Sequence, residues 1–232
     1  MRLKKNLTNK LSFFTSYSKK LEYIIAGILF FITFGIYFST MAPTVSFWDT
    51  GEFIATSYIL GIPHPPGSPL FLLIGKLFTL IPFSTDIAFR MNIFSPLISA
   101  GTISLLFLIC NQFIDRLNSN DNLKYFKMWS SVIASLTFSF THSHWFNAVE
   151  TEVYALSGFL TALVVYLILI WSKNKAETFS PMYLLGIVYV IGLATGVHLL
   201  ILLTIPFIGL IIYFSTFKFS SKGLSIALFF SL

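Results

Sequence analysis

Long apolar segments alternate with short polar ones along the whole chain. A helix needs about 20 apolar residues to cross the hydrocarbon of a bilayer. Runs of this kind predict membrane-spanning helices at residues 23–39, 91–113, 128–141 and 153–171. The apolar run 181–217 is too long for one helix and should divide near Gly196-Val197-His198, and a seventh span should begin near Leu224. We therefore predict an all-α integral membrane protein, a polytopic bundle of about seven transmembrane helices.

The apolar stretch 69–81 is predicted to be an interfacial helix at the outer face. Prolines at 65, 66 and 82 limit its helical length. At 1.5 Å per residue it would reach only about 20 Å, short of the roughly 30 Å hydrocarbon core. Lys76 also lies in its middle.

The basic residues support this topology. It leaves only Lys76 and Arg90 outside and places thirteen of the fifteen basic residues on the cytoplasmic side, as the positive-inside rule requires. Treating 69–81 as a span would move Arg116, Lys124 and Lys127 outside. We divide the chain into a cytoplasmic basic N-terminus, 1–22, and a membrane module, 23–232, with outer loops at 41–90 and 142–152. The thirteen inside are Arg2, Lys4, Lys5, Lys10, Lys19, Lys20, Arg116, Lys124, Lys127, Lys173, Lys175, Lys218 and Lys222.

Composition excludes several classes of protein. With 56% hydrophobic and 10% charged residues the chain is not a soluble domain, for which about 25% charged residues is usual. The net charge of +6 does not indicate nucleic-acid binding, because the basic residues lie between spans. The lone Cys110, inside an apolar run, excludes a disulfide framework and a metal–thiolate site.

Features near the two ends of the chain also carry expectations. A signal peptide is the alternative reading of the first apolar run, 23–40. That run is longer than a usual signal core and lacks a small-x-small cleavage site, so an uncleaved first span is favoured. The last residues lie inside a fresh apolar segment, and a further C-terminal region is expected.

Polar chemistry is concentrated at the outer end of the predicted spans. This end receives all 4 histidines and five of the nine acidic residues. Function is therefore expected there. The residues concerned are His64, His142, His144, His198, Asp49, Glu52, Asp86, Glu150 and Glu152.

Asp49 and Glu52 form the first candidate pair. Their i, i+3 spacing puts both carboxylates on one face of a helical turn. One reading is a capping box, with Asp49 at the helix start and Glu52 at its third position. The other is a general base acting on an acceptor hydroxyl. The spacing leaves both open.

Three further residues are candidates for contacting a phosphate. His64 lies in a rigid Pro-His-Pro-Pro-Gly turn near the headgroups, where its other role is to reverse the chain. His198 lies at the outward end of a span, among small residues that favour close helix packing. Arg90 begins the second span, where it either anchors the helix or offers a guanidinium fork to a lipid phosphate.

The second outer loop carries His142 and His144, followed by Glu150 and Glu152. These side chains offer nitrogen and oxygen ligands to a divalent metal. Their spacing matches no established zinc motif, however, and a solvated loop anchored by Trp145 is the alternative. No cofactor is required by the sequence, and a divalent metal stays an open alternative.

The order of these motifs resembles the protein O-mannosyltransferases of the glycosyltransferase C (GT-C) superfamily. The similar features are Asp49 with Glu52, His64-Pro65-Pro66, and Arg90-Met91, which has the reverse order of the family's Met-Arg. The family's Asp-Glu pair is contiguous, whereas two residues intervene here. A closer similarity is to a family of bacterial multi-spanning membrane proteins that includes a eukaryotic transmembrane O-mannosyltransferase. It rests on Trp48–Phe53, Gly61–Gly67, Glu150–Leu156 and Gly192–Leu199.

The resemblance implies a GT-C-type bundle and an inverting transfer of a sugar, mannose above all. The donor would be a polyprenyl-phosphate sugar and the acceptor a Ser/Thr hydroxyl of an exported protein. Asp49 would be the base, with Glu52 as the competing assignment, and Arg90, His64 and His198 would hold the donor phosphate. Glu150, Glu152, His142 and His144 would belong to the second outer loop of the active site, at the outer face of a membrane, a bacterial inner membrane by preference.

A transporter and a non-catalytic scaffold are the two other classes of function to compare with the sequence. A transporter would place ionisable residues or broken helices near the bilayer midplane, with internal repeats. No charged residue lies in the middle of a predicted span, and no repeat is evident. A non-catalytic scaffold with the same fold remains the alternative, although it has no need for so many polar residues at one end.

Overall fold

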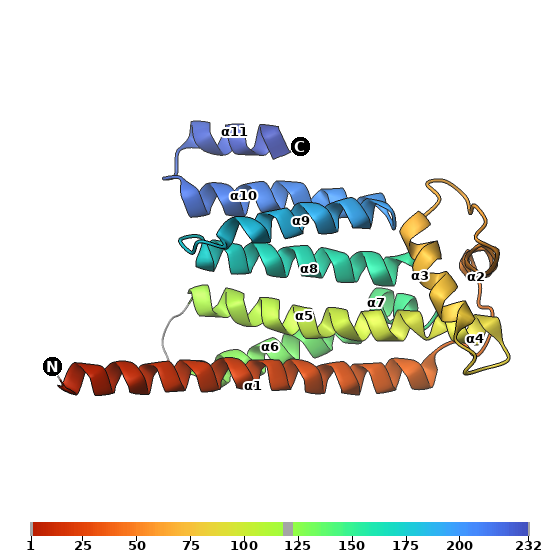
Figure 1. Ribbon diagram of the computed structural model, residues 1–232, viewed down its shortest axis with the longest axis horizontal. Helices are drawn as coiled ribbons and strands as arrows, with labels where there is room; N and C mark the ends of the chain where they lie inside the picture. Colours follow the sequence, from red (N-terminus) through yellow and green to blue (C-terminus); the bar gives the residue numbers. More distant parts are fainter. Residues whose placement is uncertain (1, 118–122, 232) are drawn as a thin grey trace.

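The computed structural model describes the backbone of residues 2–117 and 123–231, and the side chains of 19–117, 123 and 125–229. Its elements are helices, and most lie side by side along one direction (Figure 1). The parallel set is α1 (Arg2–Thr40), α5 (Phe94–Leu117), α6 (Lys124–Ser139), α8 (Val153–Asn174), α9 (Ser180–Thr195), α10 (Thr204–Thr216) and α11 (Ser221–Ser231).

Four helical segments in the described chain are long and apolar enough to cross a membrane. They are Lys19–Thr40, Ile87–Leu117, Val153–Asn174 and Leu199–Thr216. The fold is thus a helical membrane bundle, as predicted. The predicted third span is α6, with 16 residues, and the fifth is α9, also with 16. Seven spans remain a prediction.

Short helices gather at one end of the bundle (Figure 1). α2 (Thr50–Ile59), α3 (Pro69–Leu80) and α4 (Ile87–Asn92) follow α1, and α7 (His142–Ala148) follows α6. α3 is the helix expected to be interfacial, and it runs across the bundle end instead of along it. Its start is set by Pro69 at the first helical position, and the residue after its last turn, Ile81, is extended in front of Pro82.

The break predicted near residues 196–198 is confirmed. α9 ends at Thr195, and a short 3₁₀ helix, η2 (Leu199–Leu203), leads into α10. The break is held against the start of α3. Ser68 Oγ donates to the Val197 carbonyl at 2.8 Å, and Leu70 N donates to the Gly196 carbonyl at 2.8 Å.

Two hydrophobic clusters hold the fold together. The larger joins α2, α3 and α4 to α5, α8, α9 and α10, with Phe53, Phe71 and Met91 among its buried members. The smaller packs α1, α5 and α6 around Phe107, which is fully buried. α2, α3 and α4 therefore belong to the main core.

Gly75 lets α3 approach its neighbours closely. A Cβ at this position would lie 2.2 Å from Met91 Cε on α4 and 2.7 Å from Ser57 Oγ on α2. A larger residue here would therefore force the Met91 and Ser57 side chains to move.

Several predicted boundaries shift in the structure. α1 is one continuous helix from Arg2 to Thr40. The predicted division at residue 22 therefore marks a change from basic to apolar composition within this helix, and not the boundary of a structural element. α11 begins at Ser221, three residues before the predicted start of the seventh span. Residues 118–122, between the second and third predicted spans, lie outside the described residues, as do the side chains of Arg2, Lys4, Lys5, Lys10 and Lys124.

Candidate active site

The predicted polar residues lie on elements at one end of the bundle. The loop before α2, the turn between α2 and α3, the segment between α7 and α8, and the α9–η2 break all meet there (Figure 1). Together with α2, α7 and the connection between α3 and α4, these segments carry the 4 histidines and Asp49, Glu52, Asp86, Glu150 and Glu152. The expectation that these nine residues lie at one end of the bundle is confirmed.

Glu52 and His64 form the most defined contact of the site. Glu52 Oε1 accepts from the backbone N–H of His64 at 2.7 Å, and Glu52 Oε2 lies 2.7 Å from His64 Nδ1. The hydrogen bonds to His64 hold the pKa of Glu52 below its usual value, and the same carboxylate raises the pKa of His64. The two side chains are 38% and 47% exposed, so solvent weakens the pairing.

Asp49 is the unbonded acid of the site. Its exposed side chain makes no hydrogen bond to the described part of the chain, and it adds to the negative potential around His64. The capping-box reading is wrong for this pair. Asp49 has helical φ and ψ angles, −78° and −4°, and no side-chain cap bond, while Glu52 is engaged by His64.

The residue before Asp49 has a strained backbone. Trp48 has a φ of 59°, in the left-handed region that non-glycine residues rarely occupy, and its side chain is exposed. Such conformations cost about 1–3 kcal/mol and are found preferentially at functional sites. The turn at Trp48 sets the direction in which the chain enters α2 and therefore the position of Asp49.

Glu150 and Glu152 are the buried acids of the site, with relative exposures of 3% and 6%. Glu152 lies near enough to Asp49 and His64 to feel their charges. Glu150 Oε2 accepts a hydrogen bond from Ser46 Oγ, while Glu150 Oε1 is buried without a partner among the described residues. Burial raises the pKa of Glu152 to about 7, and the charges of Asp49 and Glu150 add to the rise. A carboxyl group of this kind carries a proton for a large share of the time at neutral pH.

Asn92 joins the two outer loops, and sequence reasoning missed it. Its fully buried amide donates to the carbonyls of Ala42 and Thr44 at 2.8 and 2.9 Å, and its Oδ1 accepts from Thr151 Oγ1 at 2.5 Å. Ala42 N also donates to the Val149 carbonyl at 2.8 Å. The signal was available, because a polar amide at the start of a predicted span usually has a partner.

The three predicted phosphate contacts do not form one cluster. His198 lies beside the start of α3, where the α9–η2 break is bonded to Ser68 and Leu70, and His64 lies in the turn just before it. Arg90 lies at the other end of α3, which rises about 18 Å over its length. Its Nε donates to the Ser84 carbonyl at 2.6 Å and its Nη1 to the Thr79 carbonyl at 2.9 Å.

His198 is prepared as a hydrogen-bond donor. Its Nδ1 accepts from Leu200 N at 3.1 Å, and its ring packs on Tyr154 with centroids 5.3 Å apart. Because Nδ1 is an acceptor, the neutral ring carries its proton on Nε2. Nε2 makes no hydrogen bond to the described residues.

The predicted metal set of the second outer loop is not brought together. His144 packs between aromatic rings, with Phe138 at 4.7 Å and Tyr37 at 5.9 Å between centroids. Burial lowers its pKa to about 4, so the ring is neutral at physiological pH. His142 is exposed and stacks on Phe146. Among the described residues, neither histidine lies close enough to Glu150 or Glu152 to form a cluster of metal-ligating side chains with them.

A different trio has suitable ligand spacing. The ligand atoms of Asp49, Glu52 and His64 lie within 4.8 Å of one another. Glu52 and His64 already satisfy each other, however, and an ion bound through Nδ1 would have to break that contact. The donor set therefore tolerates a divalent cation but does not require one.

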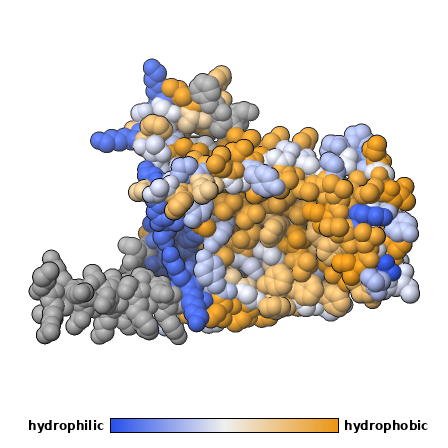
Figure 2. Space-filling view, viewed as in Figure 1, coloured by the Kyte–Doolittle hydropathy of each residue, from blue (hydrophilic) through white to orange (hydrophobic). Residues whose placement is uncertain are grey.

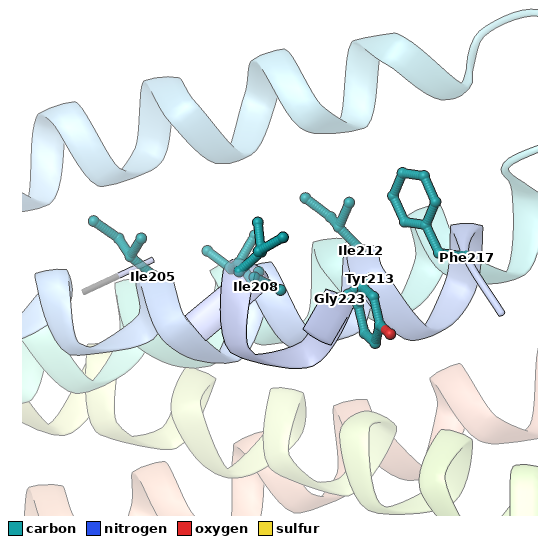
Figure 3. Close-up of a pocket in the computed structure, with 9 residues that line it drawn as sticks. Ile205, Ile208, Ile212, Tyr213, Phe217 and Gly223 are labelled. Atoms are coloured by element: carbon teal, nitrogen blue, oxygen red, sulfur yellow. The ribbon is translucent and has the colours of Figure 1, made fainter. Parts of the chain in front are cut away.

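An apolar groove lies elsewhere in the bundle. It has a volume of about 520 Å³ between α10 and α11 and is lined by residues such as Ile208, Ile212 and Phe217 (Figure 3). Its lining carries no carboxylate, histidine or basic side chain. This groove therefore offers no carboxylate, histidine or basic group for acid–base chemistry.

Comparison with known proteins places this geometry in a family. Residues 49–221 match the family described as protein O-mannosyl-transferase TMEM260 N-terminal domain, and this region begins at Asp49. The chain belongs to this family. The family's region includes α2, α3, α4 and α7, the α9–η2 break and each candidate residue named above. No solved structure matches the chain significantly.

Two curated relatives carry the same description. The chain is 28% identical over 194 residues to the protein O-mannosyl-transferase tmem260 of Dictyostelium discoideum, covering 78% of this chain and 22% of that protein. It is 33% identical over 120 residues to mouse protein O-mannosyl-transferase TMEM260, covering 51% of this chain and 15% of that protein. The matched region is thus about a fifth or less of the length of either relative.

Proposed function

We propose that this chain carries the catalytic end of a membrane glycosyltransferase that moves mannose from a polyprenyl-phosphate donor to a Ser/Thr hydroxyl of an exported protein. Its relatives are named protein O-mannosyl-transferases. The observation that carries the proposal is the unbonded carboxylate of Asp49 beside the Glu52–His64 pair. The reaction takes place at the outer face, with the N-terminus in the cytoplasm, because the charge distribution favours that orientation.

Asp49 acts as the general base in this proposal. In an inverting transfer the acceptor oxygen forms a bond to the sugar C1 while the bond from C1 to the phosphate oxygen breaks. The acceptor proton goes to the base. Asp49 has both carboxylate oxygens available for it, whereas Glu52 uses one on the His64 backbone and one on the His64 ring. Glu52 is then a positioning residue for His64.

The donor phosphate is proposed to lie near His64 and His198. Nε2 of His198 can donate to it, and a protonated His64, favoured by Glu52, supplies positive charge. Arg90 has two of its nitrogens on carbonyls of the α3–α4 connection, so its main proposed role is to hold that connection. Glu152, with a pKa of about 7, can donate a hydrogen bond to a sugar or phosphate oxygen.

The direct test measures transfer from a radiolabelled polyprenyl-phosphate mannose into protein, using membranes that contain the protein. Asp49→Asn should lower the rate by about 10²–10⁴-fold, the usual contribution of a general base, with donor binding retained. Asp86→Asn is the matched control. It is the same chemical change at the same end, and asparagine can replace aspartate as the cap of α4.

The outcomes separate the candidate functions. A normal rate for Asp49→Asn would remove Asp49 as the base, and loss of transfer in Glu52→Gln alone would move that role to Glu52. A protein that neither binds the donor lipid nor transfers label would favour the alternative, a GT-C-like scaffold without activity.

A further inference from the structure

Two polar cavities lie at the end of the bundle opposite to Asp49. One, of about 290 Å³, is lined by Gln112, Asp115, Arg116, Ser172 and Lys173. The other, of about 260 Å³, lies among α1, α5, α8 and α9 and also has Gln112 and Lys173 in its lining. Because they share these two residues, the cavities adjoin. Figure 2 shows a band of hydrophilic side chains at this end, next to the hydrophobic surface of the bundle.

Positive charge exceeds negative charge around the two cavities. Lys19, Arg116 and Lys173 contribute three cationic groups to the linings. Of the two acidic residues, Asp115 is paired with Lys127, whose Nζ lies 3.3 Å from Asp115 Oδ1. Lys127 is itself buried and does not line either cavity. The second acidic residue is Glu22. The two linings thus carry three cationic side chains against two acidic ones, a small excess of positive charge that suits an anionic ligand.

Gln112 provides a second, independent sign of a ligand. Its Oε1 is buried and has no hydrogen-bond partner among the described residues, although the side chain lines both cavities. A buried acceptor left unpaired costs about 1–3 kcal/mol, which a donor on a bound molecule would recover. The ligand should therefore carry a hydroxyl or ammonium group as well as a negative charge.

The apolar part of the lining indicates where such a ligand comes from. Leu108 and Ile170 line the same cavity as Lys19 and Lys173. The cavity thus opens between helices where hydrocarbon gives way to polar surface, which is the depth of lipid headgroups. A soluble anion would have no use for the apolar contacts.

We propose that these adjoining cavities bind the phosphodiester headgroup of an anionic glycerophospholipid. The phosphate lies against Lys19, Lys173 and Arg116, and a hydroxyl of the headgroup donates to Gln112 Oε1. The site is independent of the proposed transferase chemistry, because it lies at the opposite end of the bundle. Its ligand is a structural lipid of the bilayer and not the sugar donor.

The test measures lipid binding to the full chain in detergent, by native mass spectrometry and by the shift in Tm. Three lipids are compared: phosphatidylglycerol, phosphatidylmethanol, which is anionic but has no headgroup donor, and phosphatidylcholine, which has neither net charge nor donor. Binding should decrease in that order. Phosphatidylcholine binding as tightly as phosphatidylglycerol would overturn the proposal.

Matched variants separate the site from general surface charge. Lys19→Ala with Lys173→Ala should weaken phosphatidylglycerol binding by about fivefold per lysine. Lys20→Ala with Lys222→Ala removes two exposed lysines that line neither cavity, and should leave binding unchanged. Equal losses in both double variants would show a diffuse electrostatic effect and overturn the site. Both pairs are exposed, so neither should unfold the protein.

Gln112→Leu tests the donor contact separately. It should abolish the preference for phosphatidylglycerol over phosphatidylmethanol while leaving phosphatidylmethanol binding intact. A preference that survives the change would overturn the role of Gln112. Inorganic phosphate is the remaining arm. If it competes with the lipid and stabilises the protein equally well at the same concentration, the ligand is a soluble anion and the headgroup proposal is wrong.

Discussion

Glu52 holds His64 through both of its carboxylate oxygens, one on the backbone N–H and one on ring Nδ1. This contact closes the twelve-residue segment from α2 to the Pro-His-Pro-Pro-Gly turn. It also explains why two carboxylates three residues apart have different surroundings. Glu52 is occupied by the histidine, whereas the Asp49 side chain makes no hydrogen bond to the described part of the chain.

The titration of His64 should depend on Glu52. The carboxylate raises the pKa of His64, so the ring should titrate above its usual value of about 6.5, and Glu52→Gln should bring it back down. By the sign of the linkage, the stability that His64 contributes is fully present below about pH 6.5 and is lost as the pH rises through the raised pKa. NMR of ring-labelled histidine measures this directly. An unchanged midpoint in Glu52→Gln would contradict the pairing.

Glu152 should make the protein less stable as the pH rises. Its folded pKa of about 7 is raised above the ordinary value, so the favourable state is the protonated one. Stability is then greatest below about pH 4.5 and declines as the pH rises through 7, by roughly 3 kcal/mol as an upper bound. Glu152→Gln should remove this decline. The measurement is Tm between pH 5 and 8 for both proteins, and parallel curves would show that Glu152 does not titrate in this range.

Replacing Asn92 should loosen both outer loops at once. Asn92→Leu keeps a similar volume but leaves the Ala42 and Thr44 carbonyls and the Thr151 hydroxyl without their partner. Each unpaired buried group costs about 1–3 kcal/mol, so thermal unfolding should shift clearly downward. Thr151→Val loses one of the three bonds and should have the smaller effect. Equal effects of the two changes would show that the bonds to the first loop contribute little.

Gly75→Ala should destabilise the packing of α3 against α2 and α4. The added Cβ would overlap Met91 and Ser57, and overpacking of this kind typically costs about 1–3 kcal/mol. Gly158→Ala is the control, since nothing lies within 4 Å of its added Cβ. Met91→Ala combined with Gly75→Ala should recover part of the loss. Thermal unfolding of the wild type, Gly75→Ala, Gly158→Ala, Met91→Ala and the double variant checks this, and additive losses in the double variant would contradict the proposed overlap.

Substitutions of Arg90 and His198 should have different effects on stability and on donor affinity. Arg90→Lys should lower Tm, because lysine cannot reproduce two bonds from one planar group, but should leave donor affinity nearly unchanged. His198→Ala should weaken donor binding by about tenfold, the loss of one charge-assisted hydrogen bond, with a smaller effect on Tm. Measuring the Kd for a polyprenyl-phosphate mannose with each variant decides between them. Weaker donor binding in Arg90→Lys with unchanged binding in His198→Ala would show that Arg90, and not His198, contacts the donor phosphate.

The sequence by itself determined the class of fold and the location of its polar chemistry. Apolar run length predicted the segments that became α1, α5, α8 and α10, and the break near Gly196 was visible as a run too long for one helix. These predictions succeed because membrane insertion depends on the hydrophobicity of each segment and on satisfying backbone hydrogen bonds within it. The gathering of the histidines at one end follows from the same alternation.

Only the tertiary structure decided which polar groups act together. Asn92 and Thr151 meet across 59 positions, and Ser46 and Glu150 across 104. Spacing left open whether Asp49 caps α2 and whether His144 and Glu150 share a metal. The bonds of Glu52 and the aromatic packing of His144 disfavour both alternatives. The physical reason is that hydrogen bonding and burial depend on neighbours in space, which a local pattern does not contain.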